Sequence, residues 1–442
     1  MAARQALRRV PESAARLTED DRALLLHLLD LPTAGPLETG GGQPVRLWEA
    51  QRAYAEAAGE LGFEVVRHAP ADRSCLTGDD VPRAVQESAA ILPDFLDSQP
   101  SLVLRLGPRL ARRSTVMFNV HLDTVEGQET GRFDGGRFHG RGAIDAKGPA
   151  VGLLAGIRAA LAATPALGTE LGVLIQVVAG EEGGAMGSFG TRPLVDLGYV
   201  GRLNVFCEPT GLRVLTRSTA AMTAAIEVAG RDAIDDDPGK GHNATVLLGF
   251  LAQRLATAVP PHATDGQVCI AGIKTGPMHN KVYGSGRLLL NLSYGSQEAG
   301  RRLEGTLREA VRSGVAEFSE RFRDARDFEI TAAEAALVTR LEWLKRGLPA
   351  LTGGDRWVDD LLVRQAGLAR WPDDVPAFTC DAIWMHGVPG TSTAVFGPGS
   401  LGHNNAHAAG EFADLAELEL FARDIARLLH CFARNEIWNE AS

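Results

Sequence analysis

The sequence has few of the features that mark membrane, secreted or nucleic-acid-binding proteins. Its longest apolar stretches, Leu171–Gly180 and Val151–Ala163, fall short of the roughly 18 residues that a membrane-spanning helix needs. Basic residues are in the minority, with 45 Lys and Arg against 55 Asp and Glu, so the net charge is −10. This balance argues against a broad contact with nucleic acid or an anionic membrane, and we expect neither as a partner.

Cysteine is scarce as well. The chain has five cysteines, an odd number, scattered and never in a CxxC pair. This pattern predicts neither a disulfide framework nor a thiolate zinc site, so we expect buried free thiols. Near the N-terminus, Pro11, Glu12 and Glu19–Arg22 stand where the apolar core of a secretory signal would be. We therefore expect a cytoplasmic protein.

The first half of the chain alternates helical and strand patterns, as an α/β domain does. Strands are expected at Phe63–His68, Leu102–Leu106, Thr115–Val120, Leu171–Val178 and Asn204–Phe206, with helices before, between and after them. Several of these strands are followed directly by histidine or acidic residues. Ligands of open α/β sheets gather at the carboxyl ends of the strands, so one cleft is expected to hold these side chains.

A different pattern begins near residue 215. It is strand, helix, strand, strand, helix, strand, with the last strand expected at Phe328–Thr331. This order is that of a self-contained ferredoxin-like β-α-β-β-α-β module. We predict a catalytic domain with a mainly parallel sheet flanked by helices, formed by residues 1–214 and 334–442, and an inserted domain at residues 215–333.

The strand ends supply most of the residues suited to chemistry. His121 and Asp123 have the i, i+2 spacing that puts both side chains on one side of an extended backbone, so Asp123 can orient His121. Glu181 and Glu182 follow a buried strand and point in different directions, which lets one bind a metal while the other handles a proton. Asp145, in a glycine-rich loop before a helix, would on its own be interpreted as a helix N-cap.

Each of these motifs alone has an ordinary explanation as a solvated strand end or an incidental loop residue. Together they form a nitrogen and oxygen donor set without sulfur, which suits zinc and also cobalt or manganese. The set consists of His121, Asp145, Glu182, Glu208 and His407. Five such ligands fit two metal ions that share one aspartate. A metal pair acidifies water and polarises a carbonyl, so the expected reaction is hydrolysis of an amide.

The order and spacing of these motifs resemble the aminoacylase, acetylornithine deacetylase and glutamate carboxypeptidase family of dinuclear zinc amidohydrolases and metallopeptidases. The resemblance covers most of the chain. The matching segments are His121–Val125, Gly140–Gly148, Gly180–Gly183, Glu208–Thr210, Gly397–Gly399 and Ala406–Glu411.

The resemblance implies that Asp145 bridges the two metals. It further implies that His121 and Glu208 complete one metal site. Glu182 and His407 would complete the other.

For catalysis, the resemblance implies that Asp123 orients His121 and that Glu181 is the general acid and base. The inserted module would be the family's lid, which is commonly also a dimerisation domain. A homodimer through this lid is therefore expected.

Two positions of the insert depart from the family pattern. In Gly230–Ala244, which includes the family's Gly-x-Asn-Ala with Asn243, Ile234 replaces a histidine that helps to hold the carbonyl oxygen as it becomes an oxyanion. Losing one such donor costs on the order of 10²–10³ in rate. His242 or His403 is the alternative donor.

The second departure follows Asn280, which matches a substrate-contacting asparagine. Ser293 stands where the family usually has an arginine that grips a substrate carboxylate. Either the alignment is shifted, or Arg287 or Lys281 serves instead, or the substrate or the reaction differs from the family's.

The leading interpretation is a metal-dependent amidohydrolase, such as a deacetylase or peptidase, that acts on an N-acyl amino acid, a dipeptide or a related small amide. Ile234 and Ser293 motivate an alternative, a family member that uses its metals for acyl transfer or amide formation in a specialised biosynthetic pathway. A further alternative is a catalytically silent metal-binding partner protein. The intact Glu181 argues against a silent protein, which needs no proton carrier.

Overall fold

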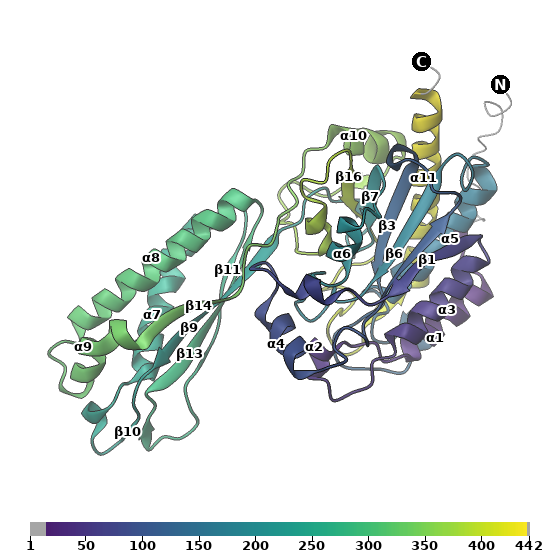
Figure 1. Cartoon of the computed structure of the whole chain (residues 1–442). Helices are drawn as coiled ribbons and strands as arrows, with labels where there is room; N and C mark the ends of the chain where they lie inside the picture. Colours follow the sequence, from purple (N-terminus) through teal and green to yellow (C-terminus); the bar gives the residue numbers. More distant parts are fainter. Residues whose placement is uncertain (1–14, 440–442) are drawn as a thin grey trace. The chain divides into compact units, whose positions relative to one another are not determined.

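The computed structural model describes residues 15–439, and the chain divides into two compact units (Figure 1). Unit 1 is formed by the described residues up to Ser218, by Leu351–Val375 and by the residues from Cys380 onwards. Unit 2 is formed by Thr219–Ala350 and Pro376–Thr379. One unit is thus inserted in the other along the chain.

A mainly parallel six-stranded sheet forms the centre of unit 1. Its order is β1-β2-β6-β3-β7-β16, and β6, β3, β7 and β16 run parallel to one another. Its strands are β1 (Phe63–Ala69), β2 (Ser101–Leu106), β3 (Thr115–His121), β6 (Gly172–Val178), β7 (Leu203–Phe206) and β16 (Ser392–Val395). Every residue of β3 is buried, as expected for a central strand covered on both faces.

Helices cover this sheet, and α5 packs closely against α11 (Figure 1). The helices of unit 1 are α1 (Glu19–Asp30), α2 (Pro36–Thr39), α3 (Leu47–Gly59), α4 (Arg83–Ile91), α5 (Lys147–Ala163), α6 (Thr191–Asp196), α10 (Arg356–Val358) and α11 (Leu415–Asn439). Gly152 and Gly156 lie one turn apart on α5. A Cβ at Gly156 would lie 2.7 Å from the Ala422 carbonyl oxygen, so only glycine lets the two helices approach this closely.

Short strands complete unit 1. The chain forms a small sheet of order β17-β5-β4 and a parallel pair, β8 with β15, which the sequence did not predict. These strands are β4 (Arg132–Asp134), β5 (Arg137–His139), β8 (Arg213–Val214), β15 (Ala369–Arg370) and β17 (Phe412–Asp414). They are too short for a periodic pattern to reveal them.

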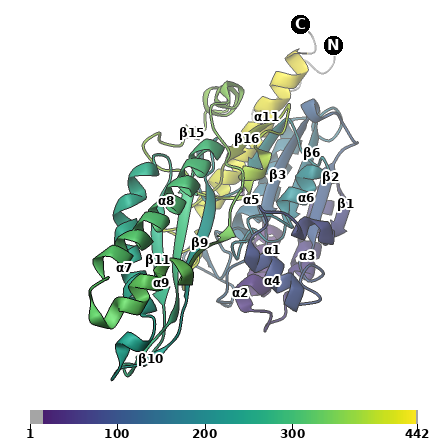
Figure 2. The ribbon, with the colours of Figure 1, turned by 60° about the vertical axis from the view of Figure 1, so that its left-hand side comes forward.

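Unit 2 has the ferredoxin-like order of elements. Its antiparallel sheet has the order β11-β13-β9-β14, and Figure 2 shows α7, α8 and α9 along one face of this sheet. The elements are β9 (Ala220–Ala229), β10 (Ala233–Ile234), α7 (Ala244–Ala258), β11 (Val268–Lys274), β12 (Lys281–Val282), β13 (Ser285–Tyr294), α8 (Gln297–Arg321), α9 (Glu329–Val338) and β14 (Thr339–Lys345). Leu288, Leu290 and Leu292 alternate along β13 and are fully buried.

The last strand of unit 2 was predicted in the wrong place. Phe328–Thr331 is not a strand, because α9 begins at Glu329, and the strand that closes the sheet is β14. The alanine-rich sequence of α9 favours a helix, and this preference outweighs the short β-like pattern before it. Unit 2 consequently extends to Ala350, beyond the predicted limit at residue 333.

The cysteines match the prediction in part. All five lie in the described part of the chain and are free. Cys207, Cys380 and Cys431 are buried, but Cys75 is half-buried and Cys269 is exposed on an edge strand, so the prediction of burial was wrong for these two. Between residues 15 and 439, no helix combines the length and the apolar character required to span a membrane.

Candidate metal centre

Parallel strands bring the predicted residues to one edge of the central sheet. His121 is the last residue of β3 and is fully buried, and it pairs in register with Val178 at the end of β6. Glu181 and Glu182 follow β6, and Glu208 follows β7 on the other side of β3. The carboxyl ends of adjacent parallel strands meet, so these side chains converge.

Asp145 lies at the centre of this group. Its Oδ1 lies 3.0 Å from His121 Nε2, and its Oδ2 lies 3.0 Å from His407 Nε2. Ala146 occupies the N-cap position of α5, so Asp145 is not the N-cap of that helix. Each oxygen of one carboxylate thus contacts a different histidine.

Two further carboxylates complete the group. Glu208 Oε1 lies 4.0 Å from His121 Nε2, and Glu182 Oε1 lies 3.0 Å from His407 Nε2. The ligand atoms of His121, Asp145 and Glu208 lie within 4.8 Å of one another, as do those of Asp145, Glu182 and His407. The structure therefore brings all five predicted ligands together as two triads that share Asp145.

The donor chemistry fits divalent cations. Within residues 15–439, Asp123 Oδ1 and Glu208 Oε1 are buried carboxylate oxygens that accept no hydrogen bond. Buried charge without a partner is costly, and cations would compensate it. Imidazole nitrogens with carboxylate oxygens are ligands of zinc, cobalt or manganese, so the residues present fit such ions.

Burial and mutual repulsion control the protonation of the cluster. Burial raises the pKa of Glu182 to about 7 and that of Glu208 to about 8, although His407 and His121 respectively oppose the shift. Hydrogen bonds from both histidines keep the pKa of Asp145 below its usual value despite its burial. Hydrogen bonds with Asp145 and Glu182 raise the pKa of His407 to about 10.

Asp123 supports the cluster in a way that differs in detail from the expectation. His121 Nδ1 lies 2.9 Å from the Asp123 backbone carbonyl oxygen and 3.8 Å from its carboxylate. The carboxylate instead accepts a hydrogen bond from the Glu182 backbone N–H, at 3.1 Å. Asp123 therefore joins the end of β3 to the loop that follows β6.

Glu181 lies beside the triads and is less enclosed than His121 or Glu208. One of its carboxylate oxygens lies within 4.8 Å of ligand atoms of His121 and Glu182. Burial, and then the charge of Glu208, raise the pKa of Glu181 well above its ordinary value. A carboxyl group with a raised pKa can exchange a proton near neutral pH.

Glu411 has a structural role that the sequence did not reveal. Its carboxylate accepts hydrogen bonds from the backbone N–H groups of Gly142, Ile144 and Asp145, at 3.0 to 3.2 Å. It also accepts one from the buried Arg141 guanidinium, at 2.9 Å. Glu411 thus fixes the loop that presents Asp145. The sequence showed only that Glu411 is an acidic residue four positions after His407, and gave no sign of its contacts with the Asp145 loop.

Asp381 was missed altogether. It is fully buried, and burial raises its pKa to about 7. The carboxylate also interacts electrostatically with Asp123, His121 and Glu182. Asp381 begins a short 3₁₀ helix, Asp381–Met385, rather than following a predicted strand, so no strand-end pattern marked it.

The three residues predicted to bind substrate lie in unit 2, and the structure does not gather them. Asn243 caps α7, accepting a hydrogen bond from the Val246 N–H at 2.9 Å, and Asn280 is exposed just before β12. Ser293 pairs with Ala221 at the opposite end of β13. The ten-residue length of β13 separates these ends by roughly 30 Å. One copy of unit 2 cannot place Asn280 and Ser293 on the same small substrate.

The proposed replacements for the two missing family residues are already engaged. His242 is buried, accepts a hydrogen bond from the Arg231 N–H at 2.9 Å and lies 3.1 Å from Glu334. Lys281 pairs with Asp232, and Arg287 pairs with Glu227. Ile234 itself is exposed on β10.

His403, the other alternative to the missing histidine, belongs to unit 1. It is exposed, and its ring packs edge-on against Phe412, with the ring centroids 5.8 Å apart. Its ring nitrogens are therefore not tied to the triads by any contact that the structure records among residues 15–439.

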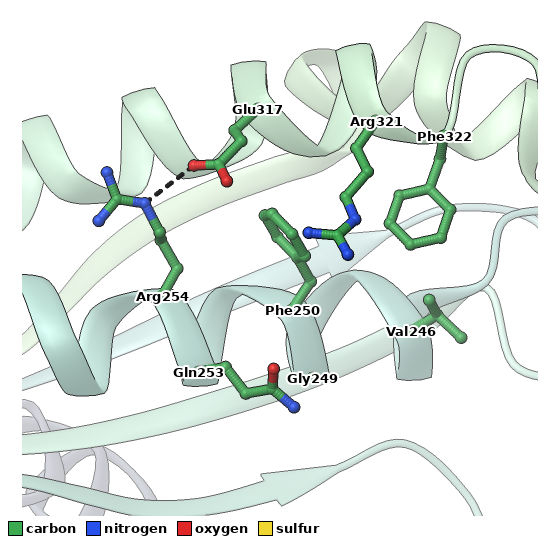
Figure 3. A pocket seen from close by; sticks show the side chains of 8 residues that line it. All are labelled: Val246, Gly249, Phe250, Gln253, Arg254, Glu317, Arg321 and Phe322. Atoms are coloured by element: carbon green, nitrogen blue, oxygen red, sulfur yellow. Dashed lines mark hydrogen bonds and ion pairs between the residues drawn. The ribbon is translucent and has the colours of Figure 1, made fainter.

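Each unit contains a hollow whose described lining residues include none of the triad residues. One, of about 520 Å³, lies between α7 and α8 of unit 2, where Arg321 stands between Phe250 and Phe322 and Arg254 pairs with Glu317 (Figure 3). Another, of about 440 Å³, includes Thr115 and Gly172, the first residues of β3 and β6. That second hollow is at the amino ends of the strands, whereas the triads are at their carboxyl ends. None of the described residues that line either hollow belongs to the triads.

Comparison with known proteins gives consistent results. Residues 117–430 match the model of peptidase family M20/M25/M40. An Aeropyrum pernix protein, provisionally named LysW-lysine/LysW-ornithine hydrolase, is 31% identical over 200 residues. That match covers 45% of this chain and only about half, 52%, of the relative.

Solved structures show the same fold. A dipeptidase from Saccharomyces cerevisiae matches with a TM-score of 0.68 at 11% identity, covering 97% of this chain and 99% of the other. A tripeptidase from Staphylococcus aureus matches with a TM-score of 0.65 at 14% identity, covering 97% and 100% of the two chains. The α/β architecture with an inserted module is therefore shared with these proteins.

Proposed function

The chain belongs to peptidase family M20/M25/M40, and from this premise we propose that it is a metal-dependent amidohydrolase with two divalent ions, which we take to be zinc. The substrate is an N-acyl amino acid, a dipeptide or a similar small amide. Placement in the aminoacylase and acetylornithine deacetylase branch is part of the proposal. A cytoplasmic location is proposed with it.

One observation supports this function above all others: two His, Glu and Asp triads share the carboxylate of Asp145. His121, Asp145 and Glu208 would hold one ion. Glu182 and His407 would hold the other, together with the second oxygen of Asp145. When bound, such ions acidify water and polarise a substrate carbonyl.

The remaining chemistry belongs to side chains. Glu181, with its raised pKa, takes a proton from the attacking water and returns it to the leaving amine. Asp123 holds the His121 ring through its carbonyl oxygen and holds the Glu182 backbone through its carboxylate. The raised pKa of Glu181 suits a group that must both accept and donate a proton near neutral pH.

The names of the relatives support an amide of an amino acid as the proposed substrate. The solved structures include a dipeptidase and a tripeptidase, and the partial relative is named for hydrolysis at lysine or ornithine. An amide of an amino acid is common to these names, and only the partial relative's name specifies a basic side chain. The relatives described here are hydrolases or peptidases, so acyl transfer is not favoured.

The direct test is metal content together with a substrate panel. Purified protein is dialysed, loaded with zinc, and assayed against N-acetylated amino acids, N-acyl-lysine and dipeptides, with and without an added amine. We expect about two zinc ions per chain and release of free amino acid that the amine does not increase. No bound metal after zinc loading, or amine-dependent product alone, would contradict the proposal.

Unit 2 is proposed to be the lid and the site of homodimerisation. This follows from the family resemblance and from the ferredoxin-like order of its elements. Sedimentation velocity of the full chain measures the oligomeric state, and a monomer at every tested concentration would exclude the dimer.

A further inference from the structure

A chain of buried hydrogen bonds ends on Asp381. Thr191 Oγ1 donates to Asp381 Oδ2 at 2.6 Å, and Asn119 Nδ2 donates both to Thr191 Oγ1 at 3.1 Å and to Gln176 Oε1 at 2.9 Å. Gln176 Nε2 in turn donates to the Tyr199 carbonyl oxygen at 2.8 Å. The Asn119 amide group needs acceptors on both sides, so the Thr191 hydroxyl must direct its hydrogen to Asp381.

This chain reaches the elements that present the metal triads. Asn119 lies two residues before His121 on β3, and residues at that spacing project from the same face of a strand. Thr191 is the first residue of α6, which follows the loop of Glu181 and Glu182. Asp381 is therefore linked to β3, which ends at His121, and to α6, which follows the loop of Glu181 and Glu182. It is not one of the proposed ligands.

The Asp381 carboxylate is confined and incompletely satisfied. The residue has no exposed surface, and its Oδ1 accepts no hydrogen bond from residues 15–439. Gly187 makes room for it, because a Cβ at that position would lie 2.6 Å from the carboxylate carbon. A buried carboxylate with a free oxygen is costly unless positive charge lies near it.

We propose that Asp381 is a positioning residue of the metal centre: through Thr191 and Asn119 it fixes the end of β3 before His121, and its buried negative charge strengthens the binding of divalent cations. The inference rests on the proposed function. The charge of Asp381 also contributes to the raised pKa values of Glu181 and Glu208. Asp381 is therefore within electrostatic reach of the triads.

Two substitutions separate the two contributions. Asp381→Asn has the same shape and keeps an oxygen for the Thr191 hydroxyl, but it removes the charge. Thr191→Val removes the hydroxyl and leaves the charge. Asp424→Asn is the matched control, because Asp424 is a largely buried carboxylate on α11 that pairs with Arg427 outside the cluster.

The measurement is zinc affinity by competition with a chromophoric chelator, together with thermal unfolding of the metal-free proteins. We expect zinc affinity to fall about 10-fold to 100-fold in Asp381→Asn, about 10-fold in Thr191→Val, and not at all in Asp424→Asn, the size usual for residues that support metal ligands. Metal-free Asp381→Asn should unfold no earlier than wild type, because the substitution removes a poorly satisfied charge. If Asp381 had only a structural role, Asp381→Asn would lower the unfolding temperature of the metal-free protein and leave zinc affinity unchanged.

The outcomes are distinct. Wild-type zinc affinity in both Asp381→Asn and Thr191→Val overturns the inference and leaves the proposed function intact. Wild-type protein that binds no zinc overturns both. If Asp381→Asn does not fold, the Thr191→Val variant tests the inference. Undiminished zinc affinity in Thr191→Val would show that the hydrogen-bond chain does not support the metal centre, and would overturn the inference.

Discussion

The two units differ in how closely they bring together the residues predicted to form a functional site. In unit 1, five side chains from five separate segments converge, and they form two triads that share one carboxylate. In unit 2, the side chains expected to recognise substrate are spread along β13, with Asn280 near one end and Ser293 at the other. Unit 1 therefore gathers its predicted ligands at one place, whereas one copy of unit 2 keeps Asn280 and Ser293 apart.

This difference shows where divergence is tolerated. A metal centre depends on several ligands at once, and changing any of them leaves buried charge uncompensated. A recognition residue acts more independently, so Ile234 and Ser293 can differ from the family pattern without disturbing the fold. Ile234 is exposed, and Ser293 uses its hydroxyl to accept a hydrogen bond from the Gln267 N–H at 2.9 Å.

The largest effect is expected for Asp145→Ala, which tests whether the two triads of unit 1 act as one metal centre. It removes the carboxylate that contacts both His121 and His407, so we expect loss of both metals and of all measurable turnover, a larger effect than the 10-fold to 100-fold typical of supporting residues. Elemental analysis and the amidase assay measure it. Asp134→Ala, at an exposed position on β4, is the control. Retained metal in Asp145→Ala would show that the two triads do not act as one centre.

Glu181→Gln should separate metal binding from proton transfer. The amide cannot carry the proton, so turnover should fall by about 10²–10⁴ while zinc content stays at the wild-type level. Single-turnover assays on zinc-loaded protein test this directly. A variant with activity within twofold of wild type would assign the proton carrier to another residue.

Ser293→Arg tests whether this position of unit 2 contacts the substrate. A guanidinium at this position would offer a charge-assisted pair to a substrate carboxylate, so we expect KM for substrates with a free carboxylate to fall about tenfold and kcat to change little. Asn291→Arg, two residues earlier on the same strand face and exposed, is the control. Equal effects of the two substitutions would mean that Ser293 has no special relation to the substrate.

The smallest expected effect concerns pH and stability. The pKa values of Glu182 and Glu208 are raised to about 7 and about 8 in the folded protein, above roughly 4.3 in the unfolded chain. Because raised carboxyl pKa values stabilise the folded state at low pH, metal-free protein should lose stability as pH rises from about 4.3 through 8, with Tm falling by on the order of 5 °C.

Zinc should reverse this trend, since metal binding requires ionised carboxylates and strengthens as pH rises. Thermal unfolding at several pH values, with chelator or with zinc, distinguishes the two cases. Glu208→Gln should flatten the upper part of the metal-free curve. A pH-independent Tm in chelator would contradict the raised pKa values.

Much of this arrangement could be predicted because it depends on local sequence. Buried apolar strands followed by His121 or Glu182, and a glycine-rich loop with Asp145, are patterns of neighbouring residues. The hydrogen bonds that the Glu411 carboxylate accepts from the Asp145 loop could not be predicted, because they join residues more than 260 positions apart. Asp381 was missed for the same reason, and its partner Thr191 lies 190 positions away.

The sequence by itself determined the main strands of the central sheet, the ferredoxin-like pattern of the insert and the chemical types of the predicted ligands, although it misplaced the last strand of the insert. These follow from side-chain periodicity and turn chemistry, which act over a few residues. Only the tertiary structure decided that Asp145 contacts two histidines, that His121 is held by a backbone carbonyl, and that Asn280 and Ser293 lie far apart. Those facts depend on strand register and on packing between distant segments, which no local pattern specifies.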